Sequence, residues 1–292
     1  MNRRGFVQAV AGTALGAALP VSDLPGSNVD PAPAIKLSVM LWTVYRDSPF
    51  EQRLEKVAEA GYHAAELVRE FEKWSGDDYR RFNARKRSLG ITFDATAGVW
   101  KGIADPAARD GFLADLKAFL GVAEKLECPG IIVLSGDRIE NLAHQAQHDA
   151  CVEALKRAAE IAARQNVTLL LENIDPEENP RYFLTSVAEG FEIVRKVDHP
   201  RVKFLYDFYH EQIAEGNLIE KLEKNIDDVG LVHIADVPGR HQPGTGEINY
   251  ENIFRKLAEL KYANYAAMEF EPVGDAVAAL RSAREMVVHS TL

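Results

Sequence analysis

From Ile35 onward, the chain alternates between two patterns of hydrophobic and polar residues. Short apolar runs rich in β-branched residues are typical of buried strands, and longer stretches with apolar residues at helical spacing are typical of amphipathic helices. The predicted strands are 35–42, 63–68, 92–96, 130–134, 168–172, 202–207, 231–235 and 266–270. The predicted helices are 50–60, 77–89, 110–126, 148–164, 186–197, 217–225, 250–260 and 273–288.

This succession of strand–helix repeats predicts an α/β fold of the (β/α)8 type, a TIM barrel that forms a single catalytic domain over residues 35–292. Each repeat spans about 32 residues, an ordinary length for one strand, one helix and their connections. Gly61, Gly90 and Gly130 mark three of the helix-to-strand joints. An open doubly wound sheet is the alternative fold, but no glycine-rich phosphate loop follows the first strand.

The first 34 residues differ in kind from the rest. Arg3 and Arg4 precede an apolar run of small residues at 7–19, and a stretch rich in Pro, Ser, Gly and Asp follows at 20–33. This pattern predicts a twin-arginine-type signal peptide and a linker over residues 1–34, and hence export to the periplasm. A chance arginine pair at an ordinary N-terminus is the alternative. After signal removal no apolar run is long enough to span a membrane.

The composition is that of a globular protein, with 47% hydrophobic and 27% charged residues. The formal net charge is −10, which argues against a nucleic-acid partner because such binding depends on Lys and Arg neutralising phosphates. Cys128 and Cys151 lie outside any CxxC pattern, so we expect two buried free thiols.

Residues typical of metal ligands lie on four consecutive predicted strands, at or near their ends. They are Glu172, Asp207, His233 and Glu269, each about one strand–helix repeat from the next. In a barrel, polar residues at the carboxyl ends of the strands face the active site, so the four side chains can converge. Taken singly, each would more often be a helix cap or an ion-pair partner, but as a set they indicate a metal centre.

Three carboxylates and one imidazole suit a hard or borderline divalent cation, namely Mn²⁺, Mg²⁺ or Co²⁺. Burying three carboxylates together without a cation would be costly, because they repel one another and lose their hydration. The sequence therefore predicts a divalent metal cofactor.

Two loops carry further candidate residues. His210 follows the sixth strand in the run 206–210 and could hold a substrate oxygen, or be an ordinary loop histidine. Arg240 could clamp a carboxylate or a hydroxyl-bearing substrate. Glu247 lies after a Pro-Gly-Thr-Gly run that we expect to be mobile, and could be an acceptor behind the ligands or part of the first turn of a helix.

Residues 35–290 resemble the xylose-isomerase-like barrel superfamily, and specifically the hydroxypyruvate isomerase family with its ketose 3-epimerase relatives. The resemblance is carried by LYDFYH at 205–210, HIADVPGR at 233–240, PGTGEINY at 243–250 and MEFEP at 268–272. It implies that Glu172, Asp207, His233 and Glu269 are metal ligands and that the two glutamates form the acid/base pair. It also implies substrate-contacting roles for His210 and Arg240, and Glu66 matches a glutamate often found after the second strand; we take Glu66 and Glu247 as substrate-binding candidates too.

The sequence departs from the family pattern at three places. His233 stands where hydroxypyruvate isomerases tend to carry Gln and the epimerases carry His. The segment 172–175 reads Glu-Asn-Ile-Asp in place of Glu-Pro-Ile-Asn, and the third strand ends at Thr96 without the expected His. These departures leave the substrate open.

The expected activity is that of a divalent-metal-dependent isomerase of a sugar or keto-acid, which transfers a proton through a cis-enediolate between Glu172 and Glu269. An epimerase or a dehydratase-lyase on the same barrel is the alternative. Less favoured are a non-catalytic sugar-binding protein and a metal-dependent endonuclease, which would need more clustered histidines and a basic face. The expected partner is a small carbohydrate or hydroxy-keto-acid substrate, and the formation of a homo-oligomer is left open.

Overall fold

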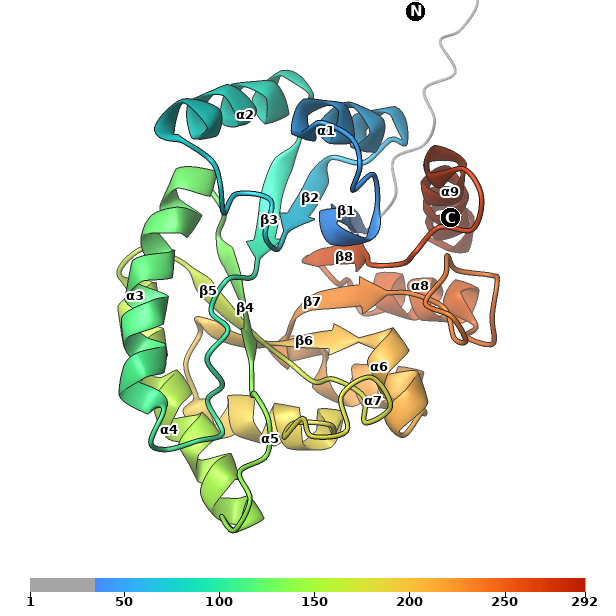
Figure 1. Cartoon of the computed structure of the whole chain (residues 1–292). Coiled ribbons are helices and arrows are strands. Elements are labelled where there is room, and N and C mark those ends of the chain that lie inside the picture. The colour runs from blue at the N-terminus through green and yellow to red at the C-terminus, as the bar shows by residue number, and fades with distance from the viewer. Residues whose placement is uncertain (1–34, 292) are drawn as a thin grey trace, which may run out of the picture. The chain divides into compact units, whose positions relative to one another are not determined.

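The computed structural model describes residues 35–291, and it consists of eight parallel strands closed into a barrel in the order β1 to β8 (Figure 1). Helices ring the strands, as the alternating sequence pattern predicts (Figure 1). The (β/α)8 fold is thus confirmed. The predicted signal peptide and linker, residues 1–34, lie outside the described residues.

The strands follow the predicted apolar runs closely. They are β1 (Lys36–Met40), β2 (Ala64–Leu67), β3 (Thr92–Thr96), β4 (Gly130–Leu134), β5 (Thr168–Glu172), β6 (Val202–Asp207), β7 (Val229–Ile234) and β8 (Tyr265–Met268). The α-helices are α1 (Phe50–Glu59), α2 (Gly76–Ser88), α3 (Arg109–Leu126), α4 (His144–Ala163), α5 (Val187–Val197), α6 (Phe208–Ala214), α7 (Leu218–Asn225), α8 (Tyr250–Glu259) and α9 (Ala276–Thr291). The described residues also form two short 3₁₀ helices, η1 (Leu41–Thr43) and η2 (Ile226–Asp228).

Two strands, β1 and β8, end two residues earlier than the apolar pattern predicts, and one helix is additional. The first strand turns into η1 after Met40, and the last ends at Met268, so that Glu269 lies just beyond it. Helix α6 begins directly at the end of β6, because Asp207 caps it by accepting hydrogen bonds from the backbone N–H groups of Tyr209 and His210. These changes place polar side chains at the carboxyl end of the barrel.

The core has two parts, as expected when strand residues alternate between the barrel interior and the helical layer. A large cluster packs the strands against the helices. A smaller cluster lies on the other face of the strands and includes Ile132, Leu170 and Leu205. Cys128 and Cys151 are buried and free, which confirms the prediction, and burial raises the pKa of both thiols. None of the described helices is long and apolar enough to cross a membrane.

Candidate metal centre and active site

The four predicted ligands come together at the carboxyl end of the barrel. Each of Glu172, Asp207, His233 and Glu269 contributes one ligand atom to a group whose atoms all lie within 4.8 Å of one another. The strand register produces this convergence, since Asp207 on β6 pairs directly with His233 on β7. All four side chains are buried.

His233 lies at the centre of the cluster. Its Nδ1 is 2.8 Å from Glu269 Oε2, 3.5 Å from Glu172 Oε1 and 3.9 Å from Asp207 Oδ2. Burial alone would lower the pKa of His233, but the nearby carboxylates, Glu269 foremost, raise it well above its ordinary value. The cluster therefore attracts positive charge.

The surroundings of Glu172 and Glu269 shift the pKa values of the two carboxyl groups in opposite directions. Burial raises the pKa of Glu172, although His233 opposes it. Burial also acts to raise the pKa of Glu269, but Arg240 and His233 together hold it well below its ordinary range. The difference arises because Arg240 Nη2 lies 2.8 Å from Glu269 Oε2.

The donor set fits a divalent cation. Asp207 Oδ2 and His233 Nδ1 are buried, and although Glu269 Oε2 lies 2.8 Å from His233 Nδ1, neither atom makes a hydrogen bond of acceptable geometry. Leaving such groups unpaired in the interior is costly, and a cation held among them would satisfy both. Carboxylate oxygens with one imidazole nitrogen are ligands that Mn²⁺, Mg²⁺, Co²⁺ and Zn²⁺ accept.

Glu66 lies behind the cluster. Its carboxylate is fully buried, and its Oε2 is 3.0 Å from His233 Nε2, the ring nitrogen that faces away from the other carboxylates. The structure thus places Glu66 against the predicted ligand His233, a position that differs from the direct substrate contact expected from the sequence. A carboxylate in this position fixes the orientation of the imidazole ring.

Arg240 closes one side of the cluster. Its guanidinium binds both Glu269 and Glu178, and it lies between the rings of Trp42 and Tyr209, at 5.4 Å and 4.9 Å from their centroids. These contacts hold the guanidinium at the edge of the cluster, the place expected for a clamp on an anionic or hydroxylated substrate.

His210 also lies beside the cluster. Its Nδ1 is 2.6 Å from Asp175 Oδ2, and its Nε2 is 3.5 Å from Asp207 Oδ2. Burial would lower the pKa of His210, but Asp207 and Asp175 outweigh it and raise the pKa to about 9. The structure therefore brings His210 into the site as a donor of hydrogen bonds.

Glu247 is not part of this group. It is exposed, and its Oε1 accepts a hydrogen bond from Gln212 at 3.1 Å. The loop that carries it is fastened by Asp236, whose carboxylate accepts hydrogen bonds from the backbone N–H groups of Gly244, Gly246 and Ile248. The Pro-Gly-Thr-Gly run thus forms a turn that is hydrogen-bonded to Asp236, and its mobility stays a prediction.

Three residues of the site were not among the sequence candidates: Trp42, Asp175 and Glu178. Trp42 Nε1 donates a hydrogen bond to Glu269 Oε1, and Glu178 binds Arg240. Asp175 lies in the segment that departs from the family pattern, a signal that could have drawn attention to it. An acidic residue six positions after Glu172 was a weaker signal for Glu178, and Trp42 had none.

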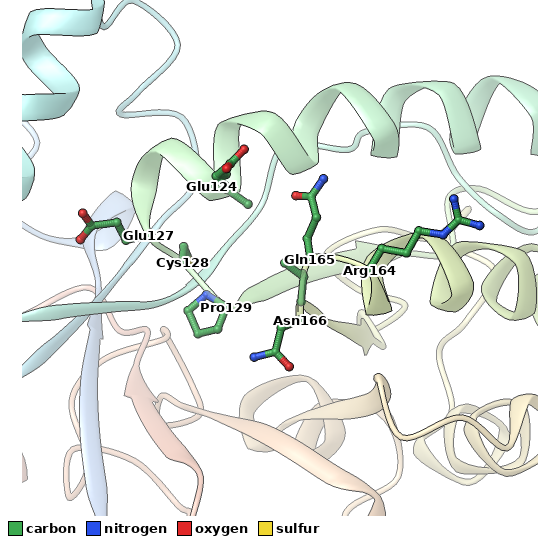
Figure 2. Close-up of a pocket in the computed structure, with 9 residues that line it drawn as sticks. Glu124, Glu127, Cys128, Pro129, Arg164, Gln165 and Asn166 are labelled. Carbon is green, nitrogen blue, oxygen red and sulfur yellow. The ribbon is translucent and has the colours of Figure 1, made fainter.

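A cavity of about 530 Å³ lies elsewhere, between the ends of α3 and α4 and the starts of β4 and β5 (Figure 2). Glu124, Glu127, Arg164, Gln165 and Asn166 are among its lining residues, and none of the predicted site residues borders it. Barrel enzymes carry their chemistry at the carboxyl ends of the strands, so this cavity does not compete with the cluster as the active site.

Comparison with known proteins identifies the family. The sequence model of the xylose isomerase-like TIM barrel family matches residues 54–287. A putative hydroxypyruvate isomerase from Danio rerio is 32% identical, over 84% of this chain and 92% of that protein. A 2-oxo-tetronate isomerase from Cupriavidus necator is 34% identical, over 82% of this chain and 92% of that protein.

Among solved structures, a protein described as AP endonuclease, family 2, from Brucella melitensis superposes with a TM-score of 0.77. It is 27% identical, and the match covers 84% of this chain and 96% of that one. The fold and the sequence comparisons thus agree. The chain belongs to the xylose isomerase-like TIM barrel family, and within it the chain is an isomerase.

Proposed function

We propose that this isomerase is divalent-metal-dependent and moves a proton between neighbouring carbons of a small hydroxylated keto-acid or sugar. One observation carries the proposal: two buried glutamates, Glu172 and Glu269, share a cluster in which Asp207 Oδ2 and His233 Nδ1 lack hydrogen-bond partners. This arrangement provides both a cation site and two groups able to move protons.

Glu172, Asp207, His233 and Glu269 would hold the cation. Mn²⁺, Mg²⁺ and Co²⁺ are the ions we favour, because oxygen ligands predominate. When bound, such an ion supplies a Lewis acid that stabilises negative charge as it develops on a substrate oxygen.

The two glutamates would divide the proton transfer between them. They come from β5 and β8, strands that are not neighbours in the barrel, so their carboxylates can approach the substrate from different directions. One would accept the proton from the hydroxyl-bearing carbon beside the carbonyl, and the other would deliver a proton to the former carbonyl carbon. The hydroxyl proton passes to the former carbonyl oxygen, so that the two hydrogens exchange places with the carbonyl group. General acid/base catalysis of this kind typically accelerates a reaction by ~10²–10⁴-fold.

Arg240 and His210 would place the substrate. Arg240 is held between Trp42 and Tyr209 with its guanidinium at the edge of the cluster, where it can pair with a carboxylate. This favours a substrate with an acid group, as in the keto-acids named for the isomerases of Danio rerio and Cupriavidus necator. His210, fixed by Asp175, is placed to bind a substrate oxygen.

An epimerase is the second candidate, and His233 favours it, because the ketose 3-epimerases carry His at this position. The two reactions differ in where the proton returns. Return to the neighbouring carbon gives isomerisation, whereas return to the same carbon inverts its configuration.

The test is to incubate Mn²⁺-loaded protein in D₂O with a panel of hydroxy-keto-acids, ketoses, aldoses and 3-keto-sugars. We expect interconversion of a keto-acid with its aldehyde isomer, and deuterium at the carbon next to the carbonyl. Inversion at one labelled carbon would establish the epimerase instead. Absence of deuterium uptake with every compound would contradict both.

Substitutions then assign the roles. Glu172→Gln and Glu269→Gln should each abolish exchange while metal is still bound, since Gln keeps an oxygen ligand but no longer accepts the proton. Glu271→Gln is the matched control, because Glu271 is two residues away but pairs on the surface with Arg46. Wild-type exchange in both Glu→Gln variants would show that another group is the base.

A further inference from the structure

A column of polar side chains runs behind the cluster, away from the substrate side. Ser38 on β1, Glu66 on β2 and Asp94 on β3 are all buried, two of them completely. Strands of a parallel barrel are usually apolar where they are buried, so three adjacent polar residues at this position call for an explanation.

Close polar contacts tie the side chains of this column to His233 and to one another. Glu66 Oε2 lies 3.0 Å from His233 Nε2, and Ser38 Oγ donates to Asp94 Oδ1 at 2.5 Å. Glu66 and Asp94 each follow directly on a pair of facing residues, Ala65 of β2 and Phe93 of β3, so the two carboxyl groups lie on neighbouring strands. Asp94 Oδ2 and Glu66 Oε1 are both buried without a hydrogen-bond partner, and a proton shared between the two carboxyl groups would satisfy both.

Two carboxyl groups can hydrogen-bond to each other only if one of them carries a proton, since an ionised carboxylate is solely an acceptor. The surroundings of Asp94 favour its protonated form. Burial, followed by the charge of Glu66, raises the pKa of Asp94 well above its ordinary value. Among the described residues Asp94 has no ion-pair partner. Lys203 lines a small cavity together with Asp94, but its amine donates to the backbone carbonyl of Asp227 instead.

We propose that Asp94 is a positioning residue: as a neutral carboxylic acid it donates a hydrogen bond to Glu66 and thereby holds the Glu66 carboxylate against His233 Nε2. Ser38 supports it by donating to the other Asp94 oxygen. The consequence is that His233 presents Nδ1 to Glu172, Asp207 and Glu269. The inference rests on the proposed function insofar as His233 is taken to be a metal ligand.

The proposal distinguishes between two substitutions of the same residue. Asp94→Asn keeps both features of the neutral acid, because its amide N–H can donate to Glu66 while its carbonyl accepts from Ser38. Asp94→Leu fills similar space but offers neither. Loss of a partner behind a metal-binding histidine typically weakens metal affinity by ~10–100-fold.

The experiment is a Co²⁺ titration of the full chain, followed by visible absorption, for the parent, Asp94→Asn and Asp94→Leu. We expect Asp94→Leu to bind Co²⁺ ~10–100-fold more weakly and Asp94→Asn to restore most of that loss. Equal weakening in both variants, or parent-like affinity in Asp94→Leu, would overturn the proposal. Ile132→Ala, a core change elsewhere on the strands, controls for general destabilisation and should not alter the affinity.

Metal-free crystals of the same variants supply a readout that does not depend on the proposed function. The contact of 3.0 Å between Glu66 and His233 should persist in the parent and Asp94→Asn and be lost in Asp94→Leu. A parent that binds no Co²⁺ would contradict the metal centre, whereas the crystals would still test Asp94. If Asp94→Leu does not fold, Ser38→Ala replaces it, with a smaller weakening of Co²⁺ binding expected and unchanged binding counting against the proposal.

Discussion

Trp42 Nε1 donates a hydrogen bond to Glu269 Oε1 at 2.8 Å, across 227 positions of the sequence. The two residues meet because β1 pairs with β8 where the barrel closes, and each lies just beyond its strand. Arg240 binds the other oxygen of the same carboxylate. The orientation of Glu269 is therefore fixed from two sides.

Trp42→Phe should impair turnover while leaving the barrel and the metal in place. The substitution keeps an aromatic ring beside Arg240 but removes the N–H that orients Glu269. A hydrogen bond to a charged group is worth about 1.5–3 kcal/mol, which corresponds to a ~10–100-fold fall in kcat/KM. Steady-state kinetics measures this fall in kcat/KM, with the substrate that the D₂O experiment identifies. Trp100→Phe is the control, because Trp100 is 50% exposed and makes no contact with Glu269; equal losses in both would refute the specific role of Trp42.

Asp207→Ala and His233→Ala should lose the bound cation. Each removes a buried ligand atom that has no hydrogen-bond partner in the cluster. Elemental analysis of the purified protein, before and after dialysis against a chelator, gives the metal content. Glu271→Gln should retain the parent's content, and Mn²⁺ binding as tight as the parent's in either alanine variant would show that the ion is held elsewhere.

Arg240→Ala should raise KM strongly and lower kcat less, because a clamp contributes mainly binding and orientation. The effect should be larger for substrates with a carboxylate than for neutral sugars. Comparing the two classes measures the contribution of the guanidinium to acid recognition. Arg181→Ala removes an exposed arginine that pairs with Asp137, and its kinetics should match the parent's. A kcat loss equal to that of Glu269→Gln, at unchanged KM, would indicate a role for Arg240 in proton transfer itself.

Glu211 should make the protein less stable as the pH rises. It is buried in α6 beside Lys221, and burial raises its pKa from 4.5 to about 7 although Lys221 opposes the shift. The folded protein keeps this proton up to about pH 7, whereas the unfolded chain loses it near its ordinary pKa. The stability from this group is thus complete below the unfolded pKa and is lost as the pH rises through the folded one.

The loss amounts to at most about 3 kcal/mol in the free energy of unfolding. Urea unfolding of the parent and Glu211→Gln at about pH 5 and about pH 8 isolates the contribution, because Gln does not titrate. The stability of the parent relative to Glu211→Gln should fall over this interval. A constant difference would mean that the folded protein ionises Glu211 as readily as the unfolded chain does.

Export is the remaining prediction. We propose that residues 1–34 direct the folded protein across the membrane through the twin-arginine pathway, which would allow metal to be bound beforehand. A fusion of these residues to a reporter should reach the periplasm and stay in the cytoplasm after Arg3→Lys and Arg4→Lys are combined. A reporter that is cytoplasmic with and without the two changes would contradict the assignment.

The barrel and the four clustered side chains could be predicted because each signal is local. Glu172, Asp207 and His233 lie within short apolar runs, and the regular repeat length gives their relation in space. Trp42 could not be predicted, since its contact depends on closure between the first and last strands. Asp94 looks in sequence like one polar residue in a half-buried strand, and only the barrel interior brings it to Ser38 and Glu66.

The pairing of β1 with β8 also determines when the site is completed during synthesis of the chain. Because β1 pairs with β8, the free edge of β1 stays unpaired on the ribosome until β8 has been synthesised. Glu269 follows β8, and so the last of the four clustered side chains arrives together with the strand that seals the barrel. A product that terminates before β8 therefore lacks both the strand that closes the barrel and the complete cluster.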